Sequence, residues 1–506
     1  MVTSLLPSKY LHRNMTVEEL ESIAEKGNTV AETHAPKRLL VAIRHASRFF
    51  HATLLALRPG FMKRLSVKHA RLRPTAYLDG IRGFAALLVY ILHHELWSHD
   101  AQKADFKLEN AWGYQGDYYV AAMPGIRNFF TGGHYAVSTF FVLSGYVLST
   151  HPLALMNAGE YTRLGDKLAS ALFRRWLRLY LPIIVTTFMT LSLWHVFGIL
   201  ADFIPEPTYS AGIWKWYVDV KNFTFVFRTG GEPWLSYNAH TWSIPVEMKG
   251  SLLIYTTCNA LSRCTQRARL LCQAVLIFYL LYIADGAHYA MFMTGMLLSD
   301  IDHIVASGSL PAWIMRMERL RSPLFHSLFL VSFYLGGAPS FDSDIQVLRD
   351  SPGWHTLSIF KPQAVFDYKW FYLFFASAFL VVSVPRISWL RRFFESCFCQ
   401  YLGRISYMFY LIHGPILWTL GDRVYAAVGF SRESHAMRIP KWSNRLPIPA
   451  IGPFAMELNF FAAQCVLLPA TLWVAEVATT VIDDNSITFC AWLYRRVTAK
   501  GTQLTG

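Results

Sequence analysis

The chain has 506 residues, of which 53% are hydrophobic, 15% are aromatic and only 16% are charged. Soluble globular proteins carry about 25% charged residues, and the apolar residues here gather in several long blocks. The composition therefore excludes an ordinary soluble domain and predicts a polytopic membrane protein. The formal net charge is +14, but no nucleic-acid recognition module accompanies it, so we expect contact with the lipid bilayer and not with nucleic acid.

The first 75 residues form a basic tail. They contain 13 Lys and Arg against 5 Asp and Glu, a surplus of eight positive charges. A basic segment ahead of the first apolar block predicts a cytoplasmic N-terminus by the positive-inside rule. Within this tail, residues 44–73 mix basic and apolar side chains, which is typical of a helix that lies in the membrane interface.

Ten apolar segments follow, counted on the basis that a membrane helix needs about 17–25 mostly apolar residues. They lie near 80–97, 134–150, 179–200, 245–262, 270–284, 286–299, 324–337, 368–387, 405–421 and 454–481. The predicted fold is therefore an all-α bundle of about ten transmembrane helices over residues 76–485, with a short basic tail at 486–506. Basic connections, including 151–178, alternate with less basic ones, which predicts that both termini are cytoplasmic. The connection at 422–453 fits least, because it is basic yet falls outside in this scheme.

The first apolar segment, YLDGIRGFAALLVYILHH, keeps ionisable residues at both of its ends. If it is a helix, Arg82 and His93 are three turns plus about 20° apart and share a face. Asp79 lies one turn before Arg82, whereas His94 is rotated away by about 100°. Ionisable groups in a membrane usually face the bundle interior and mark a pathway or a reactive site. For Asp79 and Arg82, the start of an interfacial helix is an equally good interpretation.

Four later segments also place polar residues in apolar surroundings. STFFVLSGYVLS (138–149) contains Ser144 and Tyr146, LFRRWLRLYLP (172–182) contains Arg174, Arg175 and Arg178, HTWSIPVEMKG (240–250) contains Trp242, Ser243 and Glu247, and GRISYMFYLIHGPI (403–416) contains Ser406, Tyr407 and His413. The default interpretation of the arginines is an anchor at the cytoplasmic surface. The sharper one is a binding site for a phosphorylated cosubstrate, because arginine pairs well with phosphate.

Taken together and in this order, the five motifs resemble the acyltransferase 3 family of integral membrane acyltransferases, over residues 76–485. The L-D-G-x-R-G opening, FFVLSGY, FRRWLRLYLP, TWSIPVE and GRISYMFYLIHGP carry the resemblance. Each motif is weak alone, and their common order is what makes them specific. The long basic tail and the WSIPVE sequence are similar to the eukaryotic branch that often serves small-molecule biosynthesis.

The resemblance implies transfer of an acyl group, commonly acetyl, from cytoplasmic acyl-CoA to a hydroxyl of a sugar, lipid or natural product. By position, Arg82 and His93 match the family's essential arginine and histidine. We expect His93 to act as general base, and Arg82 to bind a CoA phosphate or to stabilise the charge that develops in the reaction. We expect Glu247 to orient His93 or the acceptor, and the arginines at 174, 175 and 178 to hold acyl-CoA. The residues expected to line the substrate pore are Asp79, Ser144, Tyr146, Trp242, Ser243, Ser406, Tyr407 and His413. No permanently bound cofactor and no metal site are predicted.

Two alternatives remain at this stage. A transporter or flippase would use the same buried polar residues as a path, and would move its substrate without consuming acyl-CoA. A membrane-bound O-acyltransferase of the other fold would carry its histidine in a long apolar run with a distant Asn or Asp. The L-D-G-x-R-G opening argues against that second alternative.

Overall fold

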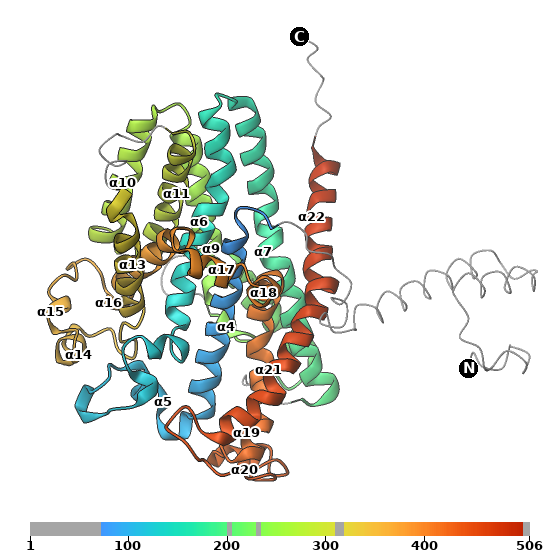
Figure 1. Cartoon of the computed structure of the whole chain (residues 1–506). Coiled ribbons are helices and arrows are strands. Elements are labelled where there is room, and N and C mark those ends of the chain that lie inside the picture. Colours follow the sequence, from blue (N-terminus) through green and yellow to red (C-terminus); the bar gives the residue numbers. More distant parts are fainter. Residues whose placement is uncertain (1–71, 200–204, 229–233, 309–317, 499–506) are drawn as a thin grey trace, which may run out of the picture. The chain divides into compact units, whose positions relative to one another are not determined.

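The protein is described by a computed structural model over residues 72–199, 205–228, 234–308 and 318–498. Nearly all of the basic tail, including the interfacial helix expected at 44–73, lies outside these residues. Within the described ranges the regular secondary structure is entirely helical, which confirms the predicted all-α fold class (Figure 1).

Each of the ten predicted apolar segments coincides with a helix. In chain order these are α4 (Ala76–Ser98), α6 (Gly133–Asn157), α7 (Tyr161–Phe197), α9 (Ser243–Ala260), α10 (Gln266–Tyr282), α11 (Ala287–Ala306), α13 (Glu318–Leu335), α16 (Tyr368–Ser383), α18 (Cys397–Ile416) and α21 (Leu458–Ala478). Five helices of the described chain are long and apolar enough to cross a membrane, at 76–98, 133–157, 161–197, 368–386 and 458–497. The count of ten spans therefore remains a prediction.

Shorter helices lie in the connections. They are α5 (Ala104–Glu109), α8 (Tyr209–Thr224), α14 (Ile345–Asp350), α15 (His355–Ser358), α17 (Ser388–Phe394), α19 (Asp422–Val428), α20 (Glu433–Arg438) and α22 (Asp484–Val497). The connection at 422–453 thus contains two short helices. A π-helical turn, Thr479–Asp483, joins α21 to α22, so the segment expected to be a C-terminal tail begins as a helix.

The connection expected at 151–178 is also helical, which corrects the prediction of a loop there. Helix α6 continues to Asn157, α7 begins at Tyr161, and the turn between them contains Gly159 at a φ of 72°. With 37 residues, α7 is about 55 Å long, whereas the hydrocarbon core of a bilayer is about 30 Å thick. A count of apolar residues detects only the part of a helix inside the hydrocarbon, so it predicts a loop for the polar first half of α7.

Glycines from the motifs allow helices distant in sequence to cross at backbone contact. A Cβ atom on Gly83 of α4 would lie 2.2 Å from the backbone nitrogen of Gly403 on α18. In the same way, a Cβ on Gly145 of α6 would lie 1.9 Å from the carbonyl oxygen of Phe292 on α11. Small residues permit such close approach between membrane helices. The first crossing holds α4 beside α18, and these two helices carry most of the candidate site.

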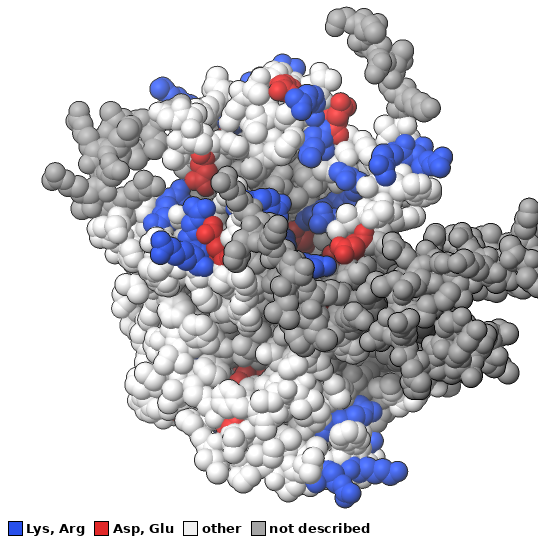
Figure 2. Space-filling view, turned by 45° about the vertical axis from the view of Figure 1, so that its right-hand side comes forward, with Lys and Arg blue, Asp and Glu red and all other residues white. Residues whose placement is uncertain are grey.

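The bundle has two ends, named here after residues of α4. At the Arg82 end, near the beginning of α4, lie the turns that follow α6, α9 and α11. At the Ser98 end lie α5, α19 and α20 (Figure 1). Figure 2 shows charged side chains at both ends and a broad, largely uncharged band between them. Large apolar side chains that are exposed on the long helices include Phe188, Met189, Leu193, Leu271, Val275, Phe278, Phe461 and Val466. In a membrane, lipid covers the exposed apolar surface of long helices. The chain is therefore a multi-pass membrane protein.

Candidate active site

Arg82 links α4 to α18 at the Arg82 end of the bundle. Its Nε donates to Ser406 Oγ at 3.0 Å and its Nη2 donates to the carbonyl oxygen of Gly403 at 2.9 Å. Its Nη2 also lies 3.2 Å from Asp79 Oδ1. The Arg82 side chain is 46% exposed, so its guanidinium is held in place yet still open to a ligand. Asp79, Arg82 and Ser406, which were expected at the site from two separate motifs, therefore lie together.

Arg175 of α7 lies mostly buried. It forms an ion pair with Glu247 of α9, and its Nε donates to Ser251 Oγ at 2.8 Å. Ser144 of α6 hydrogen-bonds the same Glu247 carboxylate. The WSIPVE glutamate, expected to orient His93 or the acceptor, therefore has an arginine as its ionic partner. The side chain of Tyr407 adds a hydrogen bond to the carbonyl oxygen of Leu179 on α7.

Arg178 is exposed and completes what we call the arginine cluster, which consists of Arg82, Arg175 and Arg178. Arg178 interacts electrostatically with both other arginines and with Asp483 of the π-helical turn. Asp483 lies outside every motif, so no signal in the sequence points to it. Asp483 also interacts with Arg82, so one carboxylate faces two members of the cluster.

Arg174 does not join the arginine cluster. Its Nε donates to the carbonyl oxygen of Ser170 at 3.1 Å, and its guanidinium carbon lies 6.0 Å from the ring centroid of Tyr494 on α22. Helical position alone does not explain the difference, since Arg174 is only about 40° from Arg178 around α7. The contacts of Arg174 with Ser170 and Tyr494 hold it apart. Two of the three predicted arginines therefore come together.

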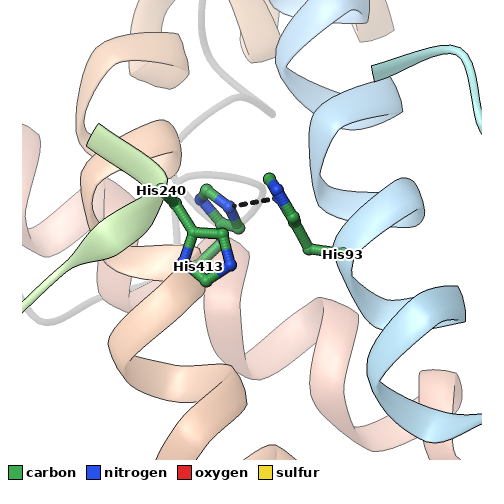
Figure 3. Close-up of side chains that lie close together, drawn as sticks. All are labelled: His93, His240 and His413. Atoms are coloured by element: carbon green, nitrogen blue, oxygen red, sulfur yellow. Dashed lines mark hydrogen bonds between the residues drawn. The ribbon is translucent and has the colours of Figure 1, made fainter. Parts of the chain in front are cut away.

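The second group of polar residues contains three histidines from three elements. His93 lies near the end of α4, His413 near the end of α18, and His240 in the 3-10 turn Ala239–Trp242 ahead of α9. Each offers one ring nitrogen, and the three nitrogens lie within 4.8 Å of one another (Figure 3). We call these residues the histidine cluster. His240 was missed in the sequence, because its place outside a long helix gives it no periodic relation to His93.

Hydrogen bonds fix the tautomers of two of these rings when both are neutral. Nδ1 of His413 lies 2.6 Å from the carbonyl oxygen of Tyr410, which can only accept, so this nitrogen carries the proton. Nε2 of His413 must then accept a hydrogen bond, and it lies 3.0 Å from Nδ1 of His93. His93 is therefore protonated on Nδ1, and its Nε2 has a free lone pair.

His94 points elsewhere, as the helical spacing predicted. It is buried, its Nδ1 lies 2.7 Å from the hydroxyl of Tyr425, and its ring stacks on Tyr90 at a centroid distance of 3.9 Å. Gln464 of α21 also reaches Nδ1 of His94 at 3.4 Å. His94 thus packs into the interface of α4 with α19 and α21, and has no part in the histidine cluster.

The remaining predicted pore residues, Ser243, Trp242 and Tyr146, have different surroundings. Ser243 Oγ lies 2.8 Å from the hydroxyl of Tyr410, which itself bonds the carbonyl oxygen of His240, so Ser243 borders the histidine cluster. Trp242 packs on Trp370 with ring centroids 5.7 Å apart. Tyr146 donates to Asp302 at 2.9 Å, and Asp302 pairs with Arg386 at 2.7 Å. Tyr146 therefore belongs to a separate ion-pair network at the Arg82 end.

Comparison with known proteins agrees with this architecture. The family described as an acyltransferase domain, acyltransferase 3, matches residues 75–477. The chain is 28% identical over 483 residues to O-acetyltransferase PaAT-1 of Phomopsis amygdali, covering 87% of this chain and 88% of that protein. It is 22% identical over 417 residues to acyltransferase clz18 of Cochliobolus lunatus, covering 71% and 86% respectively. No solved structure matches the chain. Because the family match spans most of the chain and includes both clusters, the protein belongs to the acyltransferase 3 family and is an acyltransferase.

Proposed function

We propose that the protein transfers an acyl group from acyl-CoA to a hydroxyl of a small molecule, natural product or glycan, with His93 as general base. The observation that carries this proposal is that one helix, α4, contributes to both clusters. Eleven residues separate Arg82 from His93, which is about 16 Å along the helix axis. Acyl-CoA has the same two-part character, because a long arm separates its phosphates from its reactive thioester.

The histidine cluster supplies the chemistry in this proposal. Nε2 of His93 takes the proton from the acceptor hydroxyl, and the oxygen attacks the carbonyl carbon of the thioester. The carbon–sulfur bond then breaks, and the CoA sulfur leaves and takes up a proton. His413 holds His93 in the required tautomer through its hydrogen bond to Nδ1. A general base of this kind accelerates a reaction by about 10²–10⁴-fold.

The arginine cluster binds the phosphates of acyl-CoA in this proposal. Arginine suits phosphate because its planar guanidinium donates two parallel hydrogen bonds. Arg82 and Arg178 have exposed guanidinium groups, while Arg175 is held by Glu247. The distance of about 16 Å along α4 makes Arg82 a cosubstrate ligand and not a stabiliser of charge at the thioester. Glu247 acts on binding by positioning Arg175.

Acetyl is the donor group to test first. The relative PaAT-1 is named as an O-acetyltransferase, which supports both an acetyl donor and a hydroxyl acceptor. The family assignment and the two clusters are equally compatible with longer acyl groups, so a series of acyl-CoA chain lengths belongs in the same assay.

The test measures thiol release from acetyl-CoA by the full-length protein in washed membranes, against a panel of hydroxylated acceptors. We expect release that depends on both protein and acceptor, and a fall of about 10²–10⁴-fold in kcat for His93→Gln. Full activity of His93→Gln would exclude the general-base role. Passage of an acceptor across sealed vesicles without thiol release would favour a transporter instead.

A further inference from the structure

The histidine cluster has the composition of a transition-metal site. Its three imidazoles come from α4, α18 and the turn ahead of α9, and their ring nitrogens lie within 4.8 Å of one another (Figure 3). Zn²⁺ binds histidine nitrogen at about 2.0–2.1 Å in tetrahedral geometry, which places ligand nitrogens roughly 3.4 Å apart. Nε2 of His413 and Nδ1 of His93 are 3.0 Å apart, so these two atoms need to move by only a few tenths of an ångström.

The supporting contacts also match those of a metal site. A metal-binding histidine usually donates its other ring N–H to a carbonyl or carboxylate, which fixes its orientation. Nδ1 of His413 makes this contact with the carbonyl oxygen of Tyr410 at 2.6 Å. His240 contributes a buried Nδ1 that has no hydrogen-bond partner among the described residues.

Gly414 provides the space for His240 in this position. A Cβ atom at Gly414 would lie 2.4 Å from Nδ1 of His240, so any larger residue there would displace the ring. The ring of Trp418 packs on His240 at a centroid distance of 5.1 Å. Both residues lie in or next to the GRISYMFYLIHGP motif region, which therefore shapes the pocket around the third ligand.

We propose that His93, His240 and His413 bind one divalent transition-metal ion such as Zn²⁺, and that the bound ion inhibits the transferase. Imidazole sites select zinc, copper, nickel and cobalt over magnesium and calcium, which prefer oxygen ligands. Inhibition follows from the tautomers. A metal ion on Nδ1 of His93 forces the ring proton onto Nε2, and Nε2 then has no lone pair with which to accept the acceptor's proton. The inhibition rests on the proposed function, whereas the metal binding does not.

Binding is tested with the purified full-length protein in detergent, by titration with Co²⁺ and displacement by Zn²⁺. Four-coordinate Co²⁺ absorbs visible light strongly, so the spectrum reports coordination directly. We expect one ion per chain for the wild type and binding weaker by roughly 100-fold or more for His240→Ala, because loss of an outer partner alone costs about 10–100-fold. His288→Ala is the matched control, since His288 is a half-buried histidine that packs on Trp370, outside the cluster.

A second variant keeps this test independent of folding defects. His240→Cys replaces one ligand by another, so we expect Co²⁺ binding to return with a thiolate-to-metal absorption band in the near ultraviolet. Wild-type affinity in His240→Ala, or no Co²⁺ binding by the wild type, would overturn the metal site.

Inhibition is measured separately, by mass spectrometry of the acylated product, because Zn²⁺ also binds the thiol that the reaction releases. We expect Zn²⁺ to lower product formation, a chelator to restore it, and Mg²⁺ to have no effect. If the protein binds the metal but Zn²⁺ does not change product formation, the proposed inhibition is wrong. Product formation that depends on His93 in a protein that binds no Co²⁺ would overturn the metal site and leave the proposed function standing.

Discussion

At the scale of single residues, the neighbours His93 and His94 have different surroundings and should fail in different ways. His94 is buried and bonded to Tyr425, so His94→Ala should lower the free energy of unfolding by about 1–3 kcal/mol, because it leaves a buried hydroxyl without this partner. Its kcat per folded molecule should stay close to that of the wild type. His93→Gln should show the opposite pattern, with a normal unfolding temperature and a large loss of kcat. If folded His94→Ala lost kcat instead, the general base would be His94 and not His93.

The arginines offer a second comparison within one motif. Arg178 is exposed and belongs to the arginine cluster, whereas Arg174 contacts Ser170 and Tyr494. A hydrogen bond between charged groups contributes about 1.5–3 kcal/mol, so Arg178→Ala should raise KM for acyl-CoA by roughly 10- to 100-fold with little effect on kcat. Arg174→Ala is the matched control and should leave KM nearly unchanged. Equal effects of the two substitutions on KM would mean that the whole motif acts as a diffuse positive surface.

The helical period explains which site residues could be predicted from the sequence. The 100° step per residue separates His93 from His94, and this separation holds in the structure. The period applies only within one helix, however. It could not show that His240, which precedes α9, lies beside His93, or that Asp483 of the π-helical turn faces the arginines. Those contacts depend on how distant helices pack.

At the scale of helices, the crossing of α4 and α18 depends on glycine at two motif positions. A Cβ on Gly83 would lie 2.2 Å from the backbone of Gly403, so Gly83→Ala must push the two helices apart. We expect a cost of about 1–3 kcal/mol or more, as for other overpacked interiors, measured as a lower unfolding temperature in detergent. Activity should fall as well, because both clusters bridge these helices.

The control for that substitution is Gly165, a glycine within α7 that has open space around it. No atom lies within 4 Å of the position that its Cβ would occupy. Alanine favours a helix over glycine by about 1 kcal/mol, so Gly165→Ala should leave stability unchanged or raise it. A similar loss of stability in both variants would mean that the α4–α18 crossing is not the cause.

Glu109, at the end of α5, links the connection between α4 and α6 to the bundle. Burial alone would raise the pKa of the Glu109 carboxyl, but hydrogen bonds from His134 and Ser340 and the charge of Lys369 outweigh burial and lower it. A carboxyl with a lowered pKa stabilises the fold above its ordinary pKa, and this contribution is lost as the pH falls through the lowered value.

Glu109→Gln tests how much the contacts of this carboxylate stabilise the fold. We expect the substitution to cost about 1–3 kcal/mol at neutral pH, since it weakens buried, charge-assisted hydrogen bonds. The difference in unfolding temperature between wild type and Glu109→Gln should shrink as the pH is lowered below the ordinary carboxyl range. A difference that stays constant with pH would show that the lost contact is not ionic. Ser340→Ala, which removes one neutral donor at 3.0 Å, provides a smaller loss for comparison.

At the scale of the whole molecule, composition and apolar segments predicted the fold class and the approximate helix positions. They failed where helices extend beyond the membrane. The apolar pattern predicts a loop over 151–178, whereas α7 begins at Tyr161. A polar helix outside the hydrocarbon leaves no apolar signal, because its backbone hydrogen bonds are internal and its side chains are free to be charged.

The orientation of the bundle in the membrane determines which compartment supplies the acyl donor. Lys and Arg gather in short connections at the Arg82 end, including Arg263, Arg267, Arg391 and Arg392. The positive-inside rule predicts that this end is cytoplasmic and that the basic connection at 422–453 is a long exception on the opposite side. We therefore expect acyl-CoA added outside sealed microsomes, whose outer face is cytoplasmic, to reach the arginine cluster without detergent.

Two exposed positions test this orientation directly. Ala260 ends α9 at the Arg82 end, and Lys441 lies in the connection at 422–453, at the Ser98 end. In sealed microsomes, a membrane-impermeant maleimide should label Ala260→Cys before detergent is added, and Lys441→Cys only afterwards, each measured as labelling above that of the parent chain with its native cysteines. If the order of labelling were reversed, the arginine cluster would face away from the cytoplasm. Cytoplasmic acyl-CoA could then not reach it directly. Labelling of both positions before detergent, in vesicles shown to be sealed, would mean that 422–453 follows the positive-inside rule after all and that the number of membrane crossings between α18 and α21 is different.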